Sequence, residues 1–218
     1  MGGRGLVIFD CDGVLVDSEV ISNRVLASML SDEGLPTTVA QARRDCQGLL
    51  LGEVLEHAEA KLGRRLPPGW LERYERERAE AFERELEPVR GARQAIERVT
   101  LAGITKCVAS QGKLEKTRLS LELTGLRDLF DDRALFSAHS VPRGKPHPDL
   151  FLFAAQTMGA QPAECAVVED TPSGVTAAVS ANMRAIGYAA DSDEAALRLA
   201  GAEIVHSLDE LPGMLGLD

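Results

Sequence analysis

Two aspartates separated by one residue carry the chemistry that this sequence indicates most clearly. Asp10 and Asp12 follow the apolar run 7–9 and precede Gly13, a residue type that lets the backbone turn sharply. Such a run is typical of a strand buried on both faces of a parallel sheet. Acids two positions apart would share one face of an extended strand and repel each other. A divalent cation or a shared proton would relieve this repulsion; the alternative is a turn in which the carboxylates accept only backbone hydrogen bonds.

Further polar residues recur at comparable places along the chain. Ser110 closes a second apolar run, Glu169 and Asp170 follow a third, and Lys145 stands just ahead of a helical pattern. The carboxyl ends of parallel strands form the edge of an open α/β sheet where ligands usually bind. Any one of these segments is common by chance, whereas four in a fixed order are a specific signal.

The order of these segments resembles the haloacid dehalogenase superfamily of phosphohydrolases, in the branch that holds β-phosphoglucomutase and sugar-phosphate phosphatases. The resemblance extends over nearly the whole chain. It implies that Asp10 is the nucleophile and Asp12 the acid/base. It further implies that Ser110 supplies a phosphate-binding hydroxyl, that Lys145 is a phosphate-binding lysine, and that Glu169 and Asp170 are an acidic metal-binding pair.

The charges of such a site call for a metal ion. A phosphate monoester is a dianion, and it repels an attacking carboxylate by about 4 kcal/mol per charge pair at about 4 Å and an effective dielectric constant of about 20. A metal ion bound by Asp10, Asp170 and the backbone carbonyl of Asp12 would cancel this repulsion, and Mg²⁺ suits a site made of oxygen ligands. Glu169 is either a further ligand or a residue that orients metal-bound water, and we favour the second role.

The resemblance implies a two-step reaction. Asp10 attacks phosphorus and forms an aspartyl phosphate. Asp12 protonates the departing oxygen and then removes a proton from the water that hydrolyses the intermediate. Ser110 and Lys145 bind the phosphoryl oxygens.

Substrate contacts are also expected outside the phosphate site. Gln111 directly follows the phosphate-binding Ser110, and the loop 45–50 joins two expected helices. Within that loop, Gln47 and Gly48 are expected to contact the leaving group, because the Gln47 amide can donate and accept hydrogen bonds to hydroxyls. Leu49 and Leu50 could equally be buried among the helices of the insertion.

Strand-like runs alternate with helical patterns over most of the chain. The runs lie at about 5–10, 105–109, 134–137, 165–169, 184–188 and, more weakly, 203–205. This alternation predicts an α/β fold, a Rossmann-like parallel sheet with helices on both faces.

One long segment interrupts the alternation. Residues 18–87 contain helical periodicity and no convincing strand, and the resemblance implies an inserted all-α cap domain there. We therefore expect residues 1–17 and 88–218 to form the catalytic core. The charged run 72–78 is interpreted as a solvent-exposed helix face with i,i+4 ion pairs rather than as a clamp for an anionic substrate.

Composition narrows the classes of partner. The chain has 218 residues and a formal net charge of −10, which argues against a nucleic-acid surface. No apolar run approaches the ~18 residues of a membrane span, and no signal peptide is visible. The four cysteines form no CxxC pair and are interpreted as reduced thiols of a cytoplasmic protein. Nothing in the sequence demands more than a monomer.

The expected function is a Mg²⁺-dependent phosphatase for a small phosphorylated metabolite. A sugar or sugar-acid phosphate is expected, with 6-phosphogluconate the leading single candidate. A β-phosphoglucomutase-type mutase is the first alternative, although Ser22 and Leu51 stand where mutases carry His and Arg. An inactive phosphate-binding regulator is the alternative from another class, and the retained charged positions argue against it.

Overall fold

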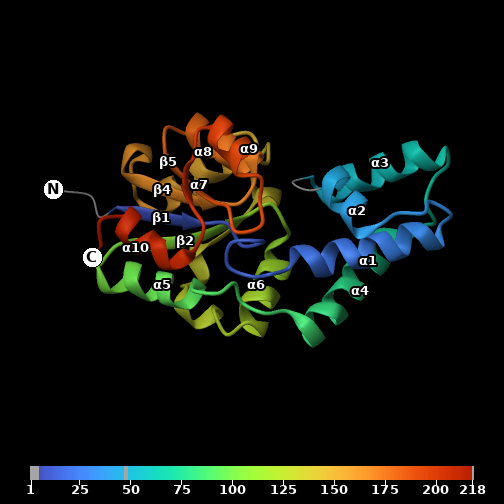
Figure 1. Cartoon of the computed structure of the whole chain (residues 1–218), viewed down its shortest axis with the longest axis horizontal. Helices are drawn as coiled ribbons and strands as arrows, with labels where there is room; N and C mark the ends of the chain where they lie inside the picture. The colour runs from blue at the N-terminus through green and yellow to red at the C-terminus, as the bar shows by residue number, and fades with distance from the viewer. Residues whose placement is uncertain (1–4, 47–48, 218) are drawn as a thin grey trace.

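The centre of the molecule is a six-stranded parallel sheet with the strand order β3-β2-β1-β4-β5-β6 (Figure 1). The computed structural model describes residues 5–46 and 49–217. Its strands are β1 (Leu6–Phe9), β2 (Thr105–Ser110), β3 (Leu135–Ser137), β4 (Cys165–Glu169), β5 (Arg184–Tyr188) and β6 (Glu203–Val205). Each lies within one residue of a run expected from the sequence, which confirms the predicted α/β fold class.

Helices cover both faces of this sheet (Figure 1). They are α5 (Ala92–Leu101), α6 (Leu114–Leu123), α7 (Asp149–Met158), α8 (Pro172–Ser180), α9 (Glu194–Ala200) and α10 (Leu211–Met214). Strand β1 runs through the middle: Val7 and Phe9 pack into the core under α5, α6 and α10, whereas Leu6 and Ile8 pack into the core under α7, α8 and α9. Burial on both faces explains why β1 is a continuous apolar run.

Between β1 and α5, the described residues contain helices joined by turns and loops and contribute no strand to the sheet. These helices are α1 (Glu19–Asp32), α2 (Val39–Cys46), α3 (Leu51–Leu62) and α4 (Trp70–Glu85), which stand to one side of the sheet in Figure 1. They share an apolar core of their own, to which Met29, Val54 and Trp70 contribute. This separate core supports the division into a cap at 18–87 and a catalytic core at 1–17 and 88–218, which we propose.

The two connections to these helices lie next to each other. The Asp17 amide donates to the Glu87 carbonyl at 3.0 Å, and the Val89 amide donates to the Leu15 carbonyl at 3.0 Å. The insertion is therefore joined to the sheet by a paired neck directly after Asp12, which places the helices over the carboxyl end of β1.

The cysteines are free thiols, as the sequence predicts. Cys11, Cys107 and Cys165 are buried, and burial raises the pKa of the Cys11 thiol to about 11. A thiol with such a pKa stays protonated near neutral pH and is a poor nucleophile. Within the described residues, no helix is long and apolar enough to cross a membrane.

Candidate active site

The polar residues singled out in the sequence meet at the carboxyl edge of three neighbouring strands. Asp10 directly follows β1, Ser110 ends β2, and Glu169 ends β4, with Asp170 next to it. Because β1 pairs with both β2 and β4, these ends lie side by side. Lys145 reaches the same edge from the loop that precedes α7. The predicted convergence at this edge is therefore present in the structure.

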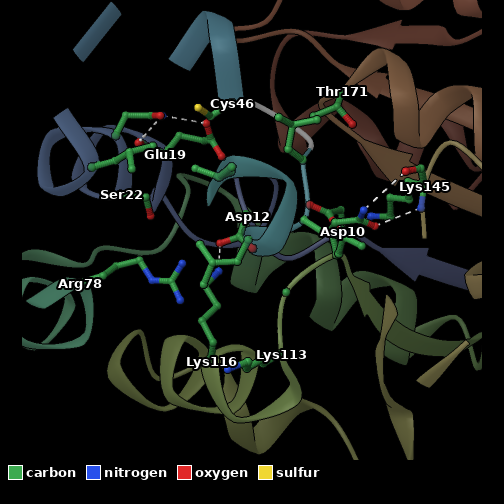
Figure 2. Close-up of a pocket in the computed structure, with 18 of the residues that line it drawn as sticks. Asp10, Asp12, Glu19, Ser22, Cys46, Arg78, Lys113, Lys116, Lys145 and Thr171 are labelled. Carbon is green, nitrogen blue, oxygen red and sulfur yellow. Dashed lines mark hydrogen bonds and ion pairs between the residues drawn. The ribbon is translucent and has the colours of Figure 1, made fainter. Parts of the chain in front are cut away.

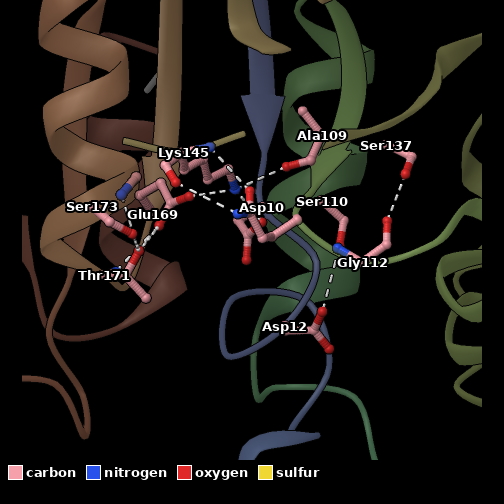
Figure 3. Close-up of polar contacts among 12 residues, drawn as sticks. Asp10, Asp12, Ala109, Ser110, Gly112, Ser137, Lys145, Glu169, Thr171 and Ser173 are labelled. Carbon is pink, nitrogen blue, oxygen red and sulfur yellow. Dashed lines mark hydrogen bonds and ion pairs between the residues drawn. The ribbon is translucent and has the colours of Figure 1, made fainter. Parts of the chain in front are cut away.

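Lys145 is a buried cation held by two carboxylates (Figure 3). Its Nζ donates to Asp10 Oδ1 and to Glu169 Oε1, each at 2.6 Å, and to the Ala109 carbonyl at 3.1 Å. The Lys145 side chain is only 4% exposed. Burial alone would lower the pKa of Lys145, but the two carboxylates outweigh it and raise the pKa above its ordinary value. The two carboxylates therefore favour the charged form of this ammonium group at the sheet edge.

Asp170 completes a cluster of buried carboxylates. One oxygen from each of Asp10, Glu169 and Asp170 lies within 4.8 Å of the others. Burial, and then the neighbouring Glu169 and Asp10, raise the pKa of Asp170 well above its ordinary value. Its Oδ1 is buried and has no hydrogen-bond partner within residues 5–46 and 49–217. A buried carboxylate oxygen without a donor, next to two more carboxylates, fits a hard divalent cation.

Glycine makes room for this carboxylate. Gly13 has φ +78°, and a Cβ at that position would overlap the Asp170 carboxylate. The sequence suggested a glycine for a sharp turn, and the structure adds a second reason for it.

Glu169 already has partners for both of its oxygens. Oε1 accepts from Lys145, and Oε2 accepts from the Thr171 hydroxyl at 2.8 Å and the Thr171 amide at 3.2 Å. Burial raises the pKa of Glu169 even though Lys145 opposes this. Of the acidic pair, Asp170 is thus the residue with a free oxygen, and Glu169 holds Lys145.

Asp12 lies apart from the carboxylate cluster. Strand β1 ends at Phe9, so the alternation of strand side chains does not continue to Asp12. Its Oδ1 accepts from the Ser18 hydroxyl and the Lys116 ammonium, and its Oδ2 accepts weakly from Ser110 Oγ at 3.5 Å. The repulsion expected between Asp10 and Asp12 is relieved by a separate lysine at each carboxylate.

Lys116 is a site residue that the sequence analysis missed. It lies in the first turn of α6, its side chain is 11% exposed, and its Nζ stands 5.6 Å from the centroid of the Phe82 ring. Burial lowers the pKa of Lys116. A sequence signal exists in hindsight, because the first turn of a helix that follows a strand after a short loop faces the same sheet edge.

Gln111 lines the pocket, where substrate contacts were expected, and its side chain also contacts the backbone of Lys145. Its Oε1 accepts from the Lys145 amide at 3.0 Å, and its Nε2 lies 3.5 Å from the Lys145 carbonyl. Gln111 therefore fixes the loop that carries Lys145, a role that the sequence did not suggest. Gln47 and Gly48, also expected to contact substrate, lie outside the described residues.

A pocket separates the sheet edge from the helical insertion (Figure 2). Asp10, Asp12 and Lys145 line its floor, and the helices supply the opposite wall. Leu49 and Leu50 of the loop 45–50 line this pocket, and the approach of this loop to the leaving group stays a prediction.

The charged run 72–78 has two kinds of residue. Arg73 and Glu77 form an i,i+4 ion pair at 2.6 Å on the surface, as expected. Glu75 and Arg78 instead line the pocket, so the interpretation of the whole run as a solvent-exposed face is wrong for these two. The reason is the packing of α4 beside α6, which turns one face of α4 toward the sheet edge.

Comparisons with known proteins agree with this geometry. Residues 7–188 match the family model of haloacid dehalogenase-like hydrolases. The chain belongs to this family. It is 32% identical over 186 residues to 6-phosphogluconate phosphatase of Escherichia coli, and the aligned region covers 85% of this chain and 82% of the relative. It is 32% identical over 211 residues to hexitol phosphatase B of Escherichia coli, which covers 94% and 92%.

Solved structures of the haloacid dehalogenase family share the fold over the full length. A family hydrolase from Deinococcus radiodurans, with bound phosphate and sodium, is similar at a TM-score of 0.80 and 30% identity, covering 98% of this chain and 97% of that one. The family resemblance drawn from the sequence motifs is confirmed.

Proposed function

We propose that this chain is a Mg²⁺-dependent phosphatase that hydrolyses a small sugar or sugar-acid phosphate. The observation that carries the proposal is the buried Lys145 ammonium between Asp10 and Glu169, beside an Asp170 oxygen that has no hydrogen-bond partner in the described part of the chain. This group of charges lies on a pocket floor, where it can hold a phosphoryl group and a cation together. Relatives named as phosphatases of 6-phosphogluconate and hexitol phosphates support the reaction class.

Asp10, Asp170 and the backbone carbonyl of Asp12 would hold the metal ion. When bound, Mg²⁺ would neutralise the phosphate dianion and so permit a carboxylate to approach it. The Asp170 oxygen without a donor supports this assignment. Glu169, whose oxygens are already occupied, would keep Lys145 in place.

The protein residues would then carry out a two-step displacement. A carboxylate oxygen of Asp10 forms a bond to phosphorus while the bond to the leaving oxygen breaks, which gives an aspartyl phosphate. Asp12 gives its proton to the leaving oxygen and later takes one from the attacking water, which releases phosphate and restores Asp10. Lys145 and Ser110 would donate hydrogen bonds to phosphoryl oxygens throughout.

Water, rather than a second sugar phosphate, is the proposed acceptor. A mutase must hold a second phosphate on the helical wall, and Ser22 and Leu51 both line that wall where mutases carry His and Arg. Neither side chain can hold a phosphate by charge, which favours hydrolysis.

A substrate screen tests the proposal. The purified protein should release inorganic phosphate from members of a panel of phosphorylated sugars, hexitols and sugar acids with Mg²⁺ present. Activity should vanish with a chelator and return when the metal is restored. Full activity in excess chelator, or no turnover of any phosphate ester with Mg²⁺, would contradict the proposed function.

A further inference from the structure

Arg78 differs from the lysines of the pocket because it forms no ion pair with an acid among the described residues. Lys145 and Lys116 are paired with carboxylates as described above, and Lys113 is paired with Glu75 at 2.6 Å. Arg78 lines the same pocket, and within the described ranges no carboxylate forms an ion pair with it. An arginine is always charged near neutral pH, so this positive charge is available to a ligand.

Two aromatic rings on the same helix hold the Arg78 guanidinium. Its central carbon lies 5.0 Å from the centroid of the Tyr74 ring and 5.9 Å from that of the Phe82 ring, one turn of α4 to either side. Both rings are buried, at 4% and 1% exposure. Contact with a ring face stabilises the cation but leaves in-plane N–H groups free to donate. These contacts favour one position of the side chain before any ligand binds.

The position of Arg78 suits the far end of a substrate. In Figure 2 its side chain extends from α4 toward Asp12, on the side away from Asp10 and Lys145. A phosphate bound at Asp10 and Lys145 would therefore leave the rest of the substrate extending past Asp12 toward Arg78. The leaving oxygen would lie near Asp12, as the proposed acid/base role requires.

The charge balance of the pocket identifies the partner. Glu75 on the same helical wall is paired with Lys113, but Glu19 also lines this wall and would repel an anionic leaving group unless the group met a cation. One unpaired guanidinium matches one negative charge, and its planar N–H fork matches a carboxylate. A second phosphate, with nearly two charges, would need a further cation, but Lys145 is assigned to the first phosphate, and Lys113 and Lys116 are paired with carboxylates.

We propose that Arg78 binds a carboxylate at the end of the substrate remote from the phosphate, so that the enzyme prefers sugar-acid phosphates to uncharged sugar phosphates. This inference rests on the proposed phosphatase function and names the substrate class of the same site. It replaces the view of Arg78 as a residue of a solvated helix face.

A pair of substrates that differ in one group tests the inference. 6-Phosphogluconate and glucitol 6-phosphate have the same carbon chain, and a carboxylate in the first replaces a hydroxymethyl group in the second. Wild-type kcat/KM should be higher for the acid. In Arg78→Gln, kcat/KM should fall about 10- to 100-fold further for the acid than for the hexitol phosphate, as expected for a lost charged hydrogen bond. Arg78→Lys should recover part of that difference.

The matched control is Arg76→Gln, on the exposed side of the same helix. It should leave kcat/KM for both substrates unchanged. Equal losses on the two substrates in Arg78→Gln, or a wild-type enzyme that does not prefer the acid, would overturn the role of Arg78.

A third substrate separates this failure from failure of the proposed function. p-Nitrophenyl phosphate carries no carboxylate and no hydroxyls. If the wild type hydrolyses this ester and Asp10→Asn does not, the phosphatase assignment stands whatever the role of Arg78. Absence of Mg²⁺-dependent turnover of all three esters would overturn both claims.

Discussion

At the scale of single residues, the two aspartates of the first motif are held by different lysines. Asp10 contacts Lys145 in the buried cluster, whereas Asp12 contacts Lys116 and Ser18 at the neck of the helical insertion. Two carboxylates in different surroundings can take different chemical roles, one as nucleophile and one as acid/base. The sequence identified both acids and Lys145 but not Lys116: its place in the first turn of a helix after a strand puts it near the sheet edge, but the pairing with Asp12 depends on a contact between residues distant in sequence.

Lys116 should matter most where the leaving group needs a proton. Lys116→Met keeps a long apolar side chain but removes the ammonium that contacts Asp12 and lies over the Phe82 ring. We expect kcat to fall about tenfold or more for an alkyl sugar phosphate, and to fall less for p-nitrophenyl phosphate, whose leaving group departs without protonation. Steady-state kinetics on the two substrates provides the measurement.

The control for Lys116→Met is Lys106→Met. Lys106 also stands over an aromatic ring, 5.8 Å from the Phe130 centroid, but it lies on β2 away from Asp12. This variant should keep wild-type kcat on both esters. The same loss on both esters in Lys116→Met would show that Lys116 supports folding rather than Asp12.

At the scale of elements, strand ends and helix starts position the site. The strands could be predicted closely because burial on both faces makes them apolar runs with clear ends. The roles of Gln111 and Arg78 could not, since each depends on a contact between elements distant in sequence. Gln111 fixes the Lys145 loop, and Arg78 reaches the pocket only because α4 packs beside α6.

The start of α8 gives a test at this scale. A Cβ on Gly174 would overlap the Glu169 carboxyl group, which cannot move without losing its hydrogen bonds to Lys145 and Thr171. Gly174→Ala should lower the free energy of unfolding by about 1–3 kcal/mol, as overpacking typically does, and should reduce kcat. Urea unfolding and kinetics measure both effects.

Gly52→Ala is the matched control for Gly174→Ala. Gly52 also lies in the first turn of a helix, α3, but a Cβ there meets no atom of the described residues within 4 Å. Because alanine favours a helix over glycine by up to about 1 kcal/mol, this variant should be as stable as the wild type or more so. Unchanged stability and activity in Gly174→Ala would contradict the close packing of Glu169.

At the scale of the whole molecule, buried carboxylates gather at one edge of the sheet, and their mutual repulsion destabilises the folded state. Asp10, Glu169 and Asp170 are all buried, and Lys145 supplies one positive charge against them. A cation that binds only the folded state stabilises it by mass action. The metal ion should therefore contribute to global stability as well as to catalysis.

Thermal unfolding with and without Mg²⁺ tests this expectation. Mg²⁺ should raise the Tm of the wild type, and Asp170→Asn should abolish that increase while raising the Tm in chelator, because an uncompensated buried charge is removed. Glu164 is an exposed acid just before the first residue of β4, at the end of the strand away from the site. The control variant Glu164→Gln should therefore show the same Mg²⁺-dependent rise in Tm as the wild type. A Mg²⁺-dependent rise of equal size in Asp170→Asn would show that the cation binds elsewhere.

The central claim is that Asp10 attacks phosphorus, and the kcat of Asp10→Asn tests it most directly. An amide is neither a nucleophile nor an anionic metal ligand, and Glu169 still pairs with Lys145 in the variant, so the fold should persist. Circular dichroism should match the wild type, while kcat for Mg²⁺-dependent phosphate release should fall by several orders of magnitude, as when an essential nucleophile is removed. A folded Asp10→Asn protein, free of contaminating phosphatase, that keeps more than about a tenth of the wild-type kcat would contradict the claim.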